Sequence, residues 1–208
     1  NLRIFGSFLR MKSSELDVAG YRDGLKGVDP QFVKRWSPRS MSGEGLSEDQ
    51  IMSLVEAARW SPSCFNLQPW RFIYSLKDDG YWTQFLGLLM DMNRLWAERA
   101  GAIMILLSVD RASETEDLSP TAAFDAGSAW MSLALQAQSM GLVSHAMWGF
   151  HHEAVAEVVN MPSNMSARAM IAIGYPGDSE DLPEKYRDRE FPSTREPLES
   201  LVFQGRLD

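Results

Sequence analysis

The sequence predicts a layered domain of the α/β or α+β class, in which helices and strands alternate. Three observations support this prediction. Short apolar runs with the length of buried strands recur along the chain, helices with recognisable capping signals separate them, and 45% of the 208 residues are apolar, as in globular proteins. A chain of this length can bury one substantial core. We therefore expect one main domain.

The first helix is marked by its cap. Residues 1–28 carry several glycines that interrupt any helical pattern, and we treat this stretch as an arm. Asp29 and Pro30 follow, and they predict a short helix that runs toward Arg35. Aspartate is a favoured N-cap, and proline is favoured at the first helical position, where no backbone donor is needed.

The next helix leads into a polar loop. Ser47 and Gln50 form a capping box, and apolar residues follow at helical spacing. Residues 61–70 then form a polar stretch bracketed by Pro62 and Pro69, which restrict the backbone of the loop. A restrained loop rich in Ser, Asn and Gln presents hydrogen-bonding groups, although an ordinary helix-to-strand connection has the same composition.

The remaining elements follow from periodicity. Segments rich in apolar, aromatic or β-branched side chains predict strands at 70–76, 102–107, 142–148 and 169–174, with a further possible strand at 198–203. Amphipathic patterns and helix-start signals predict helices at 78–96, 119–140 and 151–159. The run at 102–107 is uninterrupted, as expected of a strand buried on both faces.

Composition excludes several classes of function. The net charge is −8, from 28 acidic and 20 basic residues, which argues against a nucleic-acid-binding protein. No apolar run approaches the ~18 to 20 residues of a membrane span, so we expect no membrane association. One cysteine rules out an internal disulfide framework and fits a reducing compartment. The sequence also lacks the glycine-rich motifs of Rossmann and P-loop sites.

Metal and thiol chemistry find little support. His151 and His152 are neighbours, and adjacent residues of a helix do not share a face, so we expect no metal site. Cys64 lies in the polar loop, where a nucleophile and a small space-filling thiol are both possible readings. Arginines and serines gather at 35–39 and again at 193–195, and this composition suits phosphate as well as a solvated basic turn.

Several stretches together resemble the FMN-dependent nitroreductase family. The resemblance begins with Arg-Trp-Ser-Pro-Arg and continues with Ala-Ala-Arg-Trp-Ser-Pro-Ser-Cys-Phe-Asn-Leu-Gln-Pro-Trp-Arg-Phe. In order along the chain, the matching stretches are 35–39, 57–72, 125–127, 140–142, 149–150, 173–176 and 195–198. The likeness extends from about residue 35 to residue 203.

The resemblance implies a particular fold and assembly. It implies an α+β, three-layer α/β/α sandwich with a central mixed sheet and a C-terminal tail, residues 198–203, that is exchanged between subunits. It also implies a homodimer with FMN at the subunit interface and a cytoplasmic location. On this basis we divide the chain into an N-terminal arm at 1–34 and an FMN-binding domain at 35–208.

The resemblance also implies roles for individual residues. The phosphate and the pyrimidine edge of the flavin would be bound by Arg35, Trp36, Ser37, Arg39 and Arg195. The loop residues Pro62, Ser63, Cys64 and Asn66 would approach the same flavin from the other subunit. The ring edge and N5 would lie near Asn93, Met147, Trp148 and Gly149. Trp36 and Cys64 stand where the family often has a basic residue and a serine.

The implied activity is a flavin-mediated oxidoreduction. Hydride would pass from NADH or NADPH to FMN and then to a nitroaromatic, a quinone or a similar acceptor by a ping-pong mechanism, with no obligatory catalytic side chain. Two alternatives remain open at this stage. The chain could be an FMN-dependent dehydrogenase or dehalogenase of one specific metabolite, or a flavin-binding protein without turnover.

Overall fold

A four-stranded sheet forms the centre of the molecule. The computed structural model describes residues 16–22, 26–111 and 119–207, so parts of the predicted arm, residues 1–15 and 23–25, lie outside the described residues. The strands occur in the order β1-β2-β4-β3. Their bounds are β1 Trp70–Leu76, β2 Ala102–Val109, β3 Val143–Met147 and β4 Met165–Gly174.

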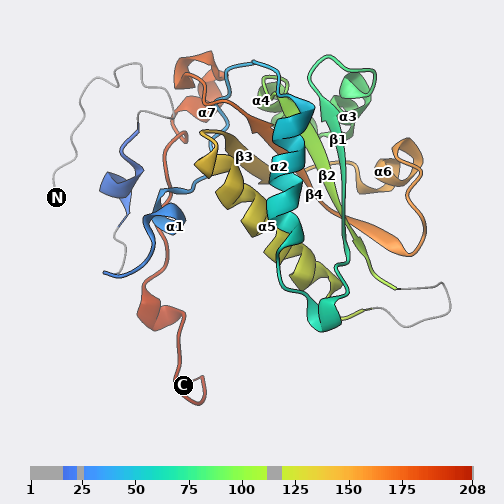
Figure 1. Cartoon of the computed structure of the whole chain (residues 1–208). Helices are drawn as coiled ribbons and strands as arrows, with labels where there is room; N and C mark the ends of the chain where they lie inside the picture. Colours follow the sequence, from blue (N-terminus) through green and yellow to red (C-terminus); the bar gives the residue numbers. More distant parts are fainter. Residues whose placement is uncertain (1–15, 23–25, 112–118, 208) are drawn as a thin grey trace.

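Helices cover both faces of this sheet. One face is covered by α2 (Glu48–Arg59) and α5 (Ala122–Ser139), which lie side by side (Figure 1). The other face is covered by α3 (Trp82–Leu88), α4 (Asp91–Ala97), α6 (His152–Val158) and α7 (Glu184–Arg187). The expected three-layer α+β sandwich is therefore confirmed. No helix among the described residues is long and apolar enough to cross a membrane.

Strand β2, one of the two inner strands, contributes side chains to a hydrophobic core on each face of the sheet. Its side chains alternate, as in any strand, so that Ala102, Met104 and Leu106 face α2 and α5. Ile103 and Ile105 face the opposite helices. Because both sets are buried, the strand has the uninterrupted apolar sequence that predicted burial on two faces.

The two predicted helix caps at Asp29 and Ser47 are confirmed. Helix α1 (Pro30–Lys34) begins after Asp29, whose carboxylate accepts a hydrogen bond from the Gln31 N–H at 2.9 Å. Ser47 and Gln50 form the reciprocal capping box of α2. Short 3₁₀ helices complete the elements: η1 Val18–Tyr21, η2 Cys64–Asn66, η3 Ser179–Asp181 and η4 Leu198–Ser200.

The predicted single helix at 78–96 is wrong, because the chain forms two helices there. Between α3 and α4 the backbone pairs with the segment that follows β3. Leu89 forms an isolated bridge with Phe150, the His151 N–H donates to the Leu88 carbonyl at 2.8 Å, and the Met90 N–H donates to the Gly149 carbonyl at 3.1 Å. These bonds with a distant segment replace the helical bonds that the periodicity predicted.

The sheet of this chain differs from the expected mixed sheet, because each of its strand pairs is antiparallel. Helices α3 and α4 return the chain to the end of the sheet at which β1 finishes, so that Leu76, the last residue of β1, pairs with Ala102, the first residue of β2. A strand that starts at this end runs antiparallel to β1. The possible strand at 198–203 is also not formed within the chain, where Leu198–Ser200 is the 3₁₀ helix η4.

Candidate functional site

A basic pocket of about 300 Å³ lies between α1, β3 and the segment before η4. Its five arginines come from three separate regions of the sequence: the arm, the turn after α1 and the C-terminal segment. The lining residues are Arg22, Arg35, Trp36, Ser37, Arg39, His145, Arg189, Phe191, Ser193 and Arg195. All five residues that the resemblance assigned to the phosphate and the pyrimidine edge therefore line one pocket.

Arg22 joins the segments that form the basic pocket. Its Nη1 donates to the carbonyls of Val33 and Arg35, each at 2.7 Å, and its Nε donates to the Ser193 carbonyl at 2.9 Å. Arg35 Nη1 in turn donates to the Ser37 hydroxyl at 3.0 Å. The end of α1 and the C-terminal segment are thus held together by a residue of the arm.

The arginines in this pocket repel one another. Burial and the Arg195 charge lower the pKa of Arg35 below its ordinary value, and burial, Arg195 and Arg35 lower the pKa of Arg22 in the same way. Among the described residues, Glu190 is the carboxylate that pairs with the group, at 3.9 Å from Arg39 Nη1. An anion would relieve this repulsion, and guanidinium forks beside a hydroxyl are a donor set suited to phosphate.

His145 lies at the inner side of the basic pocket. Its Nδ1 is 3.1 Å from the Pro38 carbonyl, which only accepts hydrogen bonds, so the proton is on Nδ1. Burial and the nearby Arg39 charge lower the pKa of His145 to about 4. The imidazole is therefore neutral at pH 7, and it packs against the Trp96 ring at 4.7 Å between centroids.

The second predicted cluster is the loop around η2. Phe65, Asn66 and Gln68 have φ values of 48°, 58° and 48°, in the left-handed region that costs energy for residues other than glycine. The Cys64 N–H donates to the buried Asp125 carboxylate at 3.2 Å, and the Ser63 hydroxyl accepts from the Gln68 N–H at 3.0 Å. Strain held by specific bonds in this way points to a functional loop.

This loop is far from the basic pocket within the chain. It lies at the end of α2, whereas the basic pocket lies beside α1 and β3 (Figure 1). The Phe65 side chain is 94% exposed at the tip of the loop. The residues Pro62, Ser63, Cys64 and Asn66 therefore do not join the basic pocket of their own chain.

A third cluster follows the end of β3. The Gly149 carbonyl accepts from Asn93 Nδ2 at 3.0 Å, in addition to the Met90 N–H. A Cβ atom at Gly149 would lie 2.7 Å from Asn93 Nδ2, so a larger residue here would displace the Asn93 amide from its bond to the Gly149 carbonyl. The Trp148 side chain is 70% exposed and packs against the His152 ring at 4.3 Å between centroids. Met147 is buried in the core.

The nitroreductase family model matches the chain at residues 33–79 and 75–175, which is more than half of its length. The chain belongs to the nitroreductase family. A protein of Thermus thermophilus named NADH dehydrogenase is 27% identical over 199 residues, covering 82% of this chain and 92% of that protein.

Solved structures agree with this family membership. A crystal structure described as an oxidoreductase containing FMN has a TM-score of 0.86 and 38% identity. The match covers 90% of this chain and 96% of the chain in that structure. A putative nitroreductase of Desulfovibrio desulfuricans, solved in complex with FMN, has a TM-score of 0.66 and 22% identity, covering 89% of this chain and all of that one. The latter supports the nitroreductase fold alone.

Three residues of this nitroreductase-family site escaped the sequence analysis. Arg22 lies in the arm, which the resemblance does not cover, and its basic side chain was the only available signal. His145 stands within the predicted strand at 142–148, where no neighbouring residue indicated a role in this pocket. Glu190 lies in a polar, proline-rich stretch with no local pattern at all. Each reaches the basic pocket through contacts with residues far away in sequence.

Proposed function

We propose that this chain is an FMN-dependent oxidoreductase that takes hydride from NADH or NADPH and reduces a nitroaromatic, a quinone or a similar acceptor by a ping-pong mechanism. One observation carries the proposal: the basic pocket, which suits a phosphate, is lined by His145 of β3, and the Trp148–Gly149 segment directly follows the end of that strand. The FMN named in the description of the 38% identical structure supports the choice of cofactor.

The spacing along β3 supports this assignment. A strand advances about 3.3 Å per residue, so Gly149 lies about 13 Å beyond His145 if the chain stays extended. FMN has a phosphate at one end and a flat ring system at the other, as such a site requires. The name of the Thermus thermophilus relative supports a nicotinamide nucleotide as electron donor.

The residues of this chain would bind and orient the cofactor. Arg35, Ser37 and Arg195 would hold the phosphate by charge-assisted hydrogen bonds, and Arg39 would face the pyrimidine edge. Bound FMN supplies the hydride-accepting and hydride-donating atom, N5. Asn93 fixes the Gly149 carbonyl, and so orients the backbone that would lie beside that atom. Positioning of this kind requires no side-chain acid or base.

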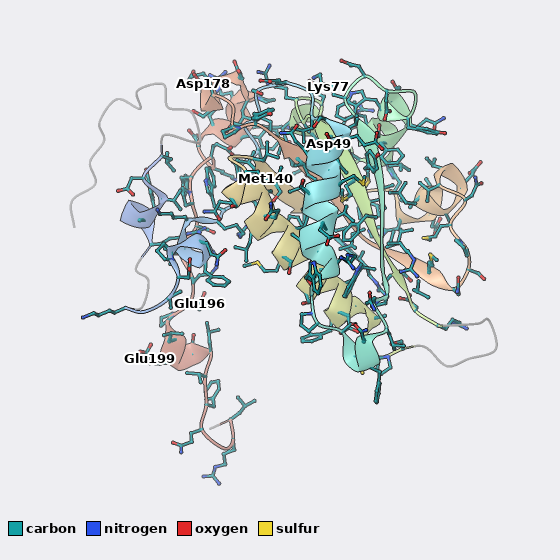
Figure 2. The ribbon with its side chains drawn as sticks, viewed as in Figure 1. Asp49, Lys77, Met140, Asp178, Glu196 and Glu199 are labelled. Atoms are coloured by element: carbon teal, nitrogen blue, oxygen red, sulfur yellow. The ribbon has the colours of Figure 1, made fainter. Side chains whose placement is uncertain are left out.

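We further propose that the active form is a homodimer. The η2 loop projects away from its own basic pocket, with Phe65 exposed at its tip. The C-terminal segment also leaves the body of the molecule, and Figure 2 shows Glu196 and Glu199 along this projecting stretch. Beyond them Leu201, Val202 and Phe203 are exposed apolar side chains. Contact with a second copy would bury these groups and bring a loop to each basic pocket.

An absorption spectrum of the purified protein tests the proposed function. We expect bands of bound FMN that persist through gel filtration, and anaerobic addition of NADH or NADPH should bleach them. A protein that stays colourless after incubation with FMN would refute the proposal. If dithionite reduces the bound FMN but neither NADH nor NADPH does, the assigned electron donor is contradicted.

A further inference from the structure

The peptide bond between Pro38 and Arg39 is held from both sides. Its carbonyl oxygen, on Pro38, lies 3.1 Å from the protonated Nδ1 of His145 on β3. Its N–H, on Arg39, donates to Glu190 Oε1 at 2.7 Å. Both groups come from elements more than a hundred residues further along the chain.

Glu190 also holds the following residue. Its Oε1 accepts from the Ser40 N–H at 2.7 Å and from the Ser40 hydroxyl at 2.8 Å. The Glu190 side chain is only 2% exposed, and such a buried carboxylate is costly unless it is paired and hydrogen-bonded. Its other oxygen, Oε2, is buried, lies 3.9 Å from Arg39 Nη1 and has no hydrogen bond among the described residues.

We infer that Glu190 and His145 are positioning residues that clamp the Pro38–Arg39 peptide and so fix the Arg39 guanidinium in the basic pocket. Glu190 has a second effect, because its negative charge offsets part of the Arg39 charge. This inference rests on the proposed function, in which Arg39 faces the pyrimidine edge of FMN. Negative charge gathers at that edge on reduction, so Arg39 favours reduced FMN and Glu190 weakens this preference.

Glu190→Gln separates the two effects of Glu190. Glutamine keeps an oxygen that can accept from Arg39 and Ser40 but removes the charge. We expect retained FMN and a midpoint potential that shifts to more positive values. A threefold gain in the affinity for reduced over oxidised FMN corresponds to about 15 mV for a two-electron couple. Dye equilibration of the holoenzyme measures this shift.

A matched control is available in Glu180→Gln. Glu180 also pairs with an arginine, Arg187 at 3.3 Å, but outside the basic pocket. This substitution removes the same charge and is expected to leave the potential at the wild-type value. Equal potentials in wild type, Glu180→Gln and Glu190→Gln would overturn the role of Glu190. An equal positive shift in both variants would overturn it as well, because the effect would then be that of net charge.

The His145 side of the clamp has its own test. His145→Leu removes the donor to the Pro38 carbonyl and is expected to weaken FMN binding about threefold to tenfold, the loss of one neutral hydrogen bond. His145→Asn places an amide N–H near the position of Nδ1 and should restore most of the affinity. Equal dissociation constants for the two variants, measured by flavin fluorescence, would overturn the clamp.

The same experiments distinguish this inference from the function on which it rests. Wild-type protein that binds no FMN would refute the proposed function and the inference together. Wild-type protein that binds FMN, with variants that change neither potential nor affinity, would leave the proposed function standing and refute the inference alone.

Discussion

The basic pocket and the η2 loop differ in how they are built. The pocket is formed by residues from distant parts of the chain. Arg22, for example, donates a hydrogen bond to Ser193, which is 171 positions away in the sequence. The loop is one short, contiguous stretch with a strained backbone, and Asp125 anchors it at Cys64. Both contain residues that the family resemblance predicts to bind FMN, yet they lie apart in one chain (Figure 1). In the proposed homodimer, each chain would supply its pocket to one flavin site and its loop to the other.

The largest expected effect is on FMN binding by a mixed dimer of two variant chains, one altered in the pocket and the other in the loop. One chain carries Arg35→Ala and Arg195→Ala, and the other carries glycine at residues 63–66, which tolerates the positive φ values of the loop. Each chain alone should lose FMN, by about 100-fold or more where two charge-assisted bonds are removed. The mixed dimer, isolated with two affinity tags, should bind one FMN, because one of its sites combines the intact halves.

A control separates this result from a general loss of binding. Lys77→Ala removes an exposed cation that lies outside the basic pocket, in the turn after β1, and its homodimer should bind two FMN. A mixed dimer without FMN would show that pocket and loop do not serve one site across the subunits. The comparison between the two regions would then describe two unrelated features.

An intermediate effect is expected from acid, which acts on the pocket through His145. The pKa of His145 is about 4 in the folded chain against an ordinary value of 6.5, so between these values the unfolded chain binds more protons. Stability should therefore fall as the pH drops from about 6.5 to 4, by at most on the order of 3 kcal/mol from this residue. Urea unfolding at pH 7 and pH 4.5 measures the loss.

His145→Asn serves as the reference for that measurement. It keeps a donor for Pro38 but does not titrate, so its loss of stability on acidification should be smaller than that of wild type. Other groups, such as Asp110, whose hydrogen bonds lower its pKa despite burial, contribute equally to both proteins. Identical losses in the two proteins would contradict the buried, neutral state of His145.

The smallest effect is expected for Cys64→Ser. The bond that anchors the loop uses the backbone N–H of Cys64, and a small polar side chain replaces another, so FMN affinity should change by about twofold or less. Turnover with a quinone and FMN titration measure the effect. Complete loss of turnover with retained FMN would instead support a nucleophilic thiol in the loop.

Prediction from sequence succeeded where a signal was local. The caps at Asp29 and Ser47 and the strand at 70–76 were confirmed, because capping bonds and strand alternation involve neighbouring residues. The predicted helix at 78–96 failed where the Leu88–Met90 backbone pairs with the segment after β3. The periodicity of one segment does not show that backbone bonds to a distant segment will replace its helical bonds.

The amino-acid pattern was sufficient to predict a layered domain of the α/β or α+β class and the positions of most elements, and the family resemblance chose α+β. Which polar groups meet became visible in the folded chain. Arg22 and His145 line one pocket, and Glu190 holds Arg39 of that pocket, because strand register and the path of the C-terminal segment bring them together. Hydrogen bonds between distant residues depend on the packing of the whole domain, so a local pattern of amino acids does not predict them.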